Sequence, residues 1–266
     1  MTACSSAFSS ASAHCGTEVW GYEPSGPPDD AAQALDQVNC YRVLLGLDPG
    51  VLVPQLDAAA TAHASYMDGQ QVLAHEEDPQ TAGFTGERVW DRIEAAGFDA
   101  GAEHVTELVA VGPGPRGAID LWMNSVYHRE VLTMPTWTGM GFGASGAYTA
   151  LAAVYPDPEG VVLYPADRQD DVPTRFDTDL ESPDPLPDHG VVGSPLTVTG
   201  ASVAAATLTG PEGDVELLFI RPGTDEDLDF MTAMLPLEPL AGSTEYTLVV
   251  DLGNGQTHTL TFRTGI

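Results

Sequence analysis

The sequence changes its pattern once, near residues 156–160, and this change constrains the fold more than any other feature. Residues before it alternate between helical and strand-like spacing, and residues after it form only short strand-like runs between turn signals. Helices that flank a short sheet make an α+β domain, whereas repeated short strands make a β-sandwich. We therefore expect a flexible tether over residues 1–30, an α+β domain over 31–158 and an all-β sandwich over 159–266.

The first part contains four segments with apolar residues at helical spacing and three segments that are typical of strands. The helices are expected at residues 29–47, 54–71, 89–98 and 116–132. The strands are expected at residues 105–112, 139–146 and 148–156. An aspartate suits the N-cap of the first helix, and Gly97 suits the end of the third.

The second part begins with a stretch rich in proline and aspartate, residues 164–195, which cannot sustain a helix. Short apolar and β-branched runs follow between glycine-containing turns. These strands are expected at residues 196–200, 202–210, 214–223 and within 245–265. Asn254 and Gly255 separate two alternating runs, and this pair favours a tight β-hairpin.

Charge excludes two classes of partner. The chain has 39 acidic and 9 basic residues, all of them arginines, and a net charge of −30. Such a surface repels phosphate backbones, so we expect no nucleic-acid binding, and anionic membrane surfaces are poor partners. No run approaches the roughly 20 apolar residues of a membrane span, so we expect no transmembrane segment.

The N-terminal stretch MTACSSAFSSASAHCG is small, polar and low in complexity, which is typical of a flexible tether. Its TAC tripeptide is similar to the end of a bacterial lipoprotein processing site, in which Cys4 would carry the lipid anchor. The apolar region that precedes such a site is missing, so a trimmed signal and an ordinary tail are the alternatives.

The three cysteines also allow two interpretations. In an exported protein, a disulfide between Cys15 and Cys40 would attach the N-terminal arm to the first helix and leave Cys4 for a lipid. In a cytosolic protein, all three would be free thiols. No C-x-x-C spacing indicates a zinc site.

Three residues of the first part are candidates for a functional site: His75, Glu107 and His128. Glu107 lies within the apolar strand pattern VTELVAV, and a buried carboxylate needs a partner. Two histidines suit this role, either to orient a proton or to hold a divalent cation with the carboxylate. Zinc is the metal that two nitrogens and one oxygen favour.

Three further residues have a structural interpretation. His63 lies on the apolar face of the second helix, so we expect a packed core histidine there. Arg92 and Arg129 lie within helices, and we expect each of them to pair with a carboxylate.

Residues 34–155 resemble the bacterial branch of the CAP superfamily, which groups cysteine-rich secretory, antigen 5 and pathogenesis-related 1 proteins. The resemblance is carried by VNCYRVLLGLDP, LDAAATAHASYM, LAHEED, FTGERVWDRIEAAGF, VTELVA, LWMNSVYHREVL and TGMGFGASG. These motifs occur in the family's order at similar spacing, and they imply an α-β-α sandwich with a central cleft.

In that family the cleft holds two histidines and two glutamates, which the resemblance assigns to His75, Glu107 and His128, with Ser125 where the second glutamate would fall. The family's Glu-Asn pair is Glu107-Leu108 here, and bulkier residues precede His128. These departures imply a narrower or less polar cleft. The closing strands LPLEPLAGSTEYTLVV and THTLTFRTG resemble bacterial immunoglobulin-like domains.

The resemblance implies a secreted or surface-anchored bacterial protein, located outside the cell or in the cell envelope. Its cleft would bind a small apolar ligand, a divalent metal or both, and its partner would be that ligand or a cell-surface component. We favour a non-enzymatic role and assign no catalytic residue. The alternative is an extracellular, protease-like hydrolase that uses the same cleft, but a serine within a helix lacks the strained turn that exposes a nucleophile.

Overall fold

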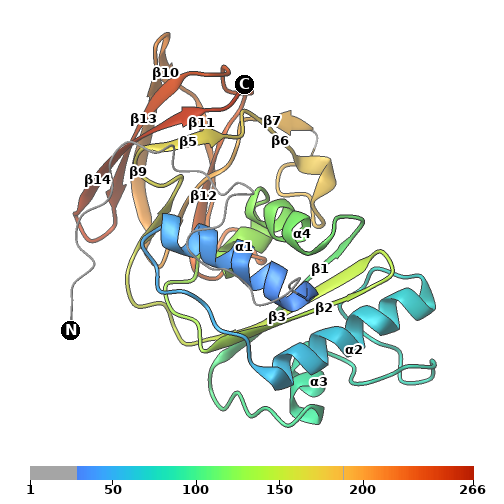
Figure 1. Cartoon of the computed structure of the whole chain (residues 1–266). Coiled ribbons are helices and arrows are strands. Elements are labelled where there is room, and N and C mark those ends of the chain that lie inside the picture. The colour runs from blue at the N-terminus through green and yellow to red at the C-terminus, as the bar shows by residue number, and fades with distance from the viewer. Residues whose placement is uncertain (1–28, 188) are drawn as a thin grey trace.

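A computed structural model describes residues 29–187 and 189–266 (Figure 1). The predicted tether therefore lies almost wholly outside the described residues. Cys4 and Cys15 also lie outside them, so the lipid anchor and the disulfide to Cys40 stay predictions. Among the described helices, none is long and apolar enough to cross a membrane.

The first region is a three-stranded antiparallel sheet with helices on both faces (Figure 1). The strand order is β1-β3-β2, with β1 at His104–Val111, β2 at Gly139–Ser145 and β3 at Tyr148–Tyr155. Its helices are α1 (Asp30–Leu44), α2 (Pro54–Gln70), α3 (Val89–Ala95), α4 (Pro115–Met123) and α5 (Tyr127–Leu132). The expected α+β architecture is confirmed.

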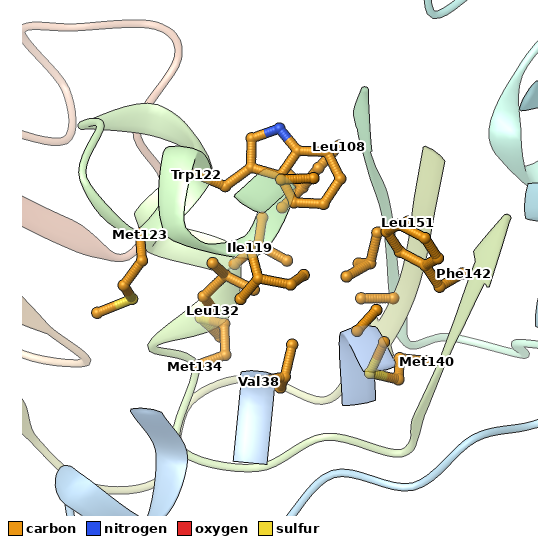
Figure 2. Close-up of a cluster of buried hydrophobic side chains, with 14 of the residues drawn as sticks. Val38, Leu108, Ile119, Trp122, Met123, Leu132, Met134, Met140, Phe142 and Leu151 are labelled. Atoms are coloured by element: carbon orange, nitrogen blue, oxygen red, sulfur yellow. The ribbon is translucent and has the colours of Figure 1, made fainter. Parts of the chain in front are cut away.

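Each face of the sheet has its own core. Leu108 of β1 packs with α1, α4 and α5, and Figure 2 shows Trp122 of α4 close to it. Val109, the next residue, packs with α2 and α3 on the opposite face. Since side chains alternate along a strand, Glu107 shares the face of Val109 and points toward α2 and α3.

Alternating glycines in β2 let α2 approach the sheet closely. A Cβ at Gly141 would lie 2.0 Å from the backbone carbon of Leu56, and one at Gly143 would lie 2.3 Å from the backbone of Thr61. The GMGFG pattern is therefore required by helix packing. This contact fixes α2, which carries His63.

The expected helix over residues 116–132 is wrong in one respect, because the structure divides it into α4 and α5. Asn124 ends α4, and the Ser125 hydroxyl donates to the Trp122 carbonyl at 2.9 Å. Serine side chains that bond to the local backbone in this way compete with the helical pattern. The break places Ser125 before α5, three residues ahead of His128.

The second region is all-β, as expected. One sheet has the order β10-β9-β13-β14-β5, and a second has the order β11-β12-β8-β4. The strands are β4 (Val162–Tyr164), β5 (Gln169–Val172), β8 (Leu196–Thr199), β9 (Val203–Gly210), β10 (Gly213–Val215), β11 (Leu217–Ile220), β12 (Met231–Pro236), β13 (Glu245–Leu252) and β14 (Thr257–Thr264). A shared apolar core contains Val198 of one sheet and Leu248 of the other.

A small two-stranded sheet and a short helical turn complete the second region. They are β6 (Phe176–Asp177), η1 (Thr178–Leu180) and β7 (Val191–Val192). Phe176 and Val192 form an apolar cluster with Val126, which precedes α5 of the first region. The two regions therefore share a buried contact at α5.

Candidate functional site

Glu107 lies at the centre of a buried charged cluster. Its Oε1 accepts a hydrogen bond from the Arg92 guanidinium at 2.8 Å, and its Oε2 lies 3.2 Å from Nδ1 of His75. Arg92 also donates to the carbonyl of His75 at 3.0 Å. Arg92 therefore pairs with a carboxylate, as the sequence predicted, and holds the His75 loop against Glu107.

His63 and Glu77 extend this cluster. Nδ1 of His63 lies 2.8 Å from Glu77 Oε1, while its Nε2 lies 2.8 Å from the Ala74 carbonyl and 3.4 Å from Glu107 Oε2. Both ring nitrogens thus face oxygen atoms, and the ring can donate at both positions only when it carries both protons. Glu77 is held in turn by the backbone N–H of Thr85 at 2.6 Å.

Two carboxylates therefore lie together in this cluster. Glu77 and Glu107 are placed between the Arg92 guanidinium and the ring of His63. All four side chains are at most 3% exposed. Buried ionic groups are tolerated when they are paired and hydrogen-bonded in this way.

His75 is the accessible member of the cluster, with 57% of its side chain exposed. A carboxylate can only accept, so Nδ1 of His75 carries the proton that it shares with Glu107. The loop that carries His75 also exposes Leu73 (51%) and Phe84 (40%). An imidazole that contacts a buried carboxylate is thus exposed in a loop that also exposes apolar side chains.

His128 has a different set of partners. Its Nδ1 lies 2.8 Å from Glu181 Oε1 and 3.1 Å from the Ser125 hydroxyl. Glu181 belongs to the all-β region and also accepts the backbone N–H groups of Val126 at 2.7 Å and Tyr127 at 2.8 Å. The His128 side chain is 20% exposed, whereas that of Glu181 is 1% exposed.

The predicted site residues therefore fall into two pairs. His75 contacts Glu107, and His128 contacts Ser125. Within residues 29–187 and 189–266, no hydrogen bond or ion pair joins one pair to the other, and no group of three or more histidine, cysteine or acidic side chains is arranged to hold a metal. The hydrogen bond from Arg92 to Glu107 also disfavours this carboxylate as a direct zinc ligand.

The hydrolase alternative can be tested on the geometry of His128. A serine nucleophile needs a histidine that contacts the hydroxyl through one ring nitrogen and the orienting carboxylate through the other. Here Ser125 and Glu181 both meet Nδ1, and the Ser125 hydroxyl proton is directed to the Trp122 carbonyl. With both partners on Nδ1, His128 cannot accept a proton from Ser125 at one nitrogen while Glu181 orients the other.

Arg129 departs from the sequence prediction. Its guanidinium donates to the carbonyls of Met123 at 2.6 Å and Pro195 at 2.5 Å, and it lies 4.2 Å from the centre of the Tyr164 ring. Hydrogen bonds to backbone oxygens thus replace the expected carboxylate. Burial lowers the pKa of Arg129.

A separate hollow of about 780 Å³ lies along α3 and the start of β1. Its apolar lining includes Trp90, Phe98 and Val105, and its acidic lining includes Glu94 and Glu103. None of the predicted site residues lines it. The hollow is therefore distinct from the cluster around Glu107.

Two residues of the site were missed by the sequence interpretation, namely Glu77 and Glu181. Glu77 lies two positions after His75 in the motif HEED, so a local signal existed. Glu181 lies 53 positions after His128 and belongs to the proline-rich stretch, so no local pattern connects it to the site.

The first region is similar to a known protein family. Residues 35–155 match the family profile described as CAP, cysteine-rich secretory protein family. No protein among curated sequences matches this chain.

Three solved structures are similar to part of the chain. An extracellular protein with an SCP domain from Bacillus anthracis is 22% identical, with a TM-score of 0.40, over 49% of this chain and 45% of its own. A cysteine-rich secretory protein from Staphylococcus aureus is 18% identical, with a TM-score of 0.38, over 50% of this chain and 40% of its own. An outer surface protein from Borrelia burgdorferi is 17% identical, with a TM-score of 0.36, over 45% of this chain and 87% of its own. The match thus spans less than half of the Bacillus and Staphylococcus chains.

Proposed function

We propose that this chain, whose residues 35–155 form a CAP domain, is an exported bacterial binding protein without enzymatic activity. It would reside outside the cell or on the cell surface. Its ligand would be a small molecule with an apolar body and one polar group. The all-β region would act as an immunoglobulin-like module that presents the CAP domain.

One observation carries this proposal: a buried cluster of ionisable side chains presents a single accessible polar group, the imidazole of His75. Exposed Leu73 and Phe84 lie in the same loop and would contact the apolar part of a ligand. Ligand sites commonly combine apolar side chains with a few fixed polar groups. Catalysis is not favoured, since Ser125 and Glu181 share one nitrogen of His128.

The first prediction is that His75 is required for ligand retention. Protein purified without detergent should carry a small molecule that native mass spectrometry detects, and the His75→Ala variant should lose it. His189, an exposed histidine of the all-β region, offers a matched control, and His189→Ala should retain the molecule. Equal occupancy in the wild type and His75→Ala would refute a role for this histidine.

A divalent metal is a second candidate for the ligand of this protein, and zinc is the metal that histidine nitrogens favour. His75 and His128 each have Nδ1 against a carboxylate, Glu107 and Glu181 respectively, so each has Nε2 available. Histidines that bind metals usually donate their other ring N–H to a carboxylate in this manner. Zinc bound by both nitrogens would link the two histidines and retain open positions for water or ligand.

The second prediction tests this metal candidate by calorimetric titration with zinc chloride. The His75→Ala and His128→Ala variants should each lose most of the binding, because each imidazole would supply one of the protein ligands. His189→Ala should bind as the wild type does. Zinc binding that survives in both single variants would exclude this pair as the site.

A further inference from the structure

Glu181 of the all-β region forms a hydrogen bond with the side chain of His128. It follows the short turn η1, and its carboxylate is buried against the start of α5. Oε2 accepts the Val126 N–H, while Oε1 accepts the Tyr127 N–H and lies 2.8 Å from Nδ1 of His128. The backbone N–H of His128 lies farther from Oε1, at 3.4 Å. With it, four groups of the first region contact the Glu181 carboxylate of the second region.

We infer that Glu181 is a positioning residue for His128, and that the all-β region completes this half of the site. The inference rests on the proposed zinc site at His75 and His128. It adds that a segment outside the CAP domain determines which nitrogen of His128 is available to a ligand.

The hydrogen-bond chemistry determines which ring nitrogen of His128 carries the proton. The Glu181 carboxylate cannot donate, so Nδ1 of His128 must carry the shared proton. The Ser125 hydroxyl donates to the Trp122 carbonyl, so toward the ring it too can act only as an acceptor. Both neighbours therefore favour the tautomer with the proton on Nδ1 and a lone pair on Nε2.

Glu181 contributes more to the choice of the His128 tautomer than Ser125 does. A hydrogen bond from an imidazole N–H to a carboxylate is charge-assisted and stronger than one to a neutral hydroxyl. The Glu181 contact is also the shorter of the two, at 2.8 Å against 3.1 Å. A negative partner on Nδ1 raises the basicity of Nε2, which strengthens its bond to a metal.

The same contacts allow a merely structural role, in which Glu181 holds α5 against the all-β region. Glu130 offers a matched comparison, because its buried carboxylate joins α5 to the same region from the other side. Glu130 accepts the N–H groups of Asp229, Phe230 and Met231 at 3.0 to 3.3 Å. The Glu130→Gln variant should therefore alter the contact between regions while leaving the His128 ring in place.

The third prediction is measured on the full chain in two ways. Nitrogen-15 NMR of metal-free protein at pH 8 should show the His128 proton on Nδ1 in the wild type and in Glu130→Gln. In Glu181→Ala the Nδ1-protonated fraction should fall, because only the neutral Ser125 hydroxyl then still favours that tautomer. Titration with zinc chloride should show binding weakened about 10- to 100-fold in Glu181→Ala and close to wild type in Glu130→Gln.

Glu181→Gln keeps the length and shape of the side chain where the alanine variant is unstable, and it should weaken zinc binding about tenfold, because the charge is removed. An unchanged tautomer and unchanged zinc affinity in both Glu181 variants would overturn the inference. Equal losses in Glu130→Gln and Glu181→Ala would also overturn it, in favour of a structural role. Absence of zinc binding in the wild type would reject the metal site alone, since the NMR measurement still decides the role of Glu181.

Discussion

At the scale of single residues, His63 is the member of the cluster around Glu107 whose contacts differ most from the prediction. His63 is fully buried, and its ring lies within hydrogen-bond distance of Glu77 and Ala74. The sequence predicted a packed core histidine, and His63 is buried as such a residue would be, but its contacts are polar. A second proton on this ring would offset one of the two carboxylates, Glu77 and Glu107, while Arg92 offsets the other.

The fourth prediction concerns His63. Replacement by alanine leaves two buried carboxylates with one cation, and breaking a buried pair in this way costs about 3–5 kcal/mol. Urea denaturation at pH 7 should therefore show a large loss in the free energy of unfolding. The double variant His63→Ala/Glu77→Gln restores the balance of charge, so it should lose less than the sum of the two single variants. Strictly additive losses would contradict charge compensation as the reason for this arrangement.

At the scale of elements, local patterns predicted most of the first region. The spacing of apolar residues correctly predicted α1, α2 and α3, and the alternating runs correctly predicted β1, β2 and β3. The pairing of His75 with Glu107 was also predictable, because a carboxylate inside an apolar strand needs a partner. The helices and strands are determined by residues close in sequence. The pairing of His75 with Glu107 follows from the burial of one carboxylate.

The break between α4 and α5 was not predictable in this way. Trp122, Met123 and Val126 continue the apolar spacing across the break, so the sequence favours one helix. The backbone N–H groups that the break frees at Val126 and Tyr127 are satisfied by Glu181, which lies far along the chain. A partner from another region has overridden the local pattern, and it also replaces Ser125 as the main contact of His128.

On the scale of the whole molecule, α5 links the two regions through carboxylates in both directions. Glu181 of the all-β region binds the start of α5, and Glu130 of α5 binds the backbone that leads into β12. The Thr133 and Thr199 hydroxyls lie 2.7 Å apart in the same contact. Because these groups are buried, a change in the charge of one of them affects the attachment of both regions.

The fifth prediction follows from the charge of Glu130. Burial raises the pKa of its carboxyl to about 7, against an ordinary value of 4.5, although the hydrogen bonds from Phe230 and Asp229 oppose this shift. A raised pKa means that the folded protein takes up the proton first. The stability linked to Glu130 is therefore fully present below about pH 4.5 and is lost as pH rises through about 7. The size of this effect is on the order of 3 kcal/mol.

Lower pH also reduces repulsion across a chain with a net charge of −30, so the wild type alone does not isolate Glu130. Glu130→Gln imitates the protonated carboxyl at every pH. Its free energy of unfolding relative to the wild type should therefore become more favourable from pH 5 to pH 8. The exposed Glu245→Gln substitution removes the same charge from the surface and should leave the difference from the wild type nearly constant over this range. Chemical denaturation at several pH values measures both differences. A constant difference for Glu130→Gln would mean that Glu130 keeps its charge when buried, and the two regions would then stay attached without a dependence on this proton.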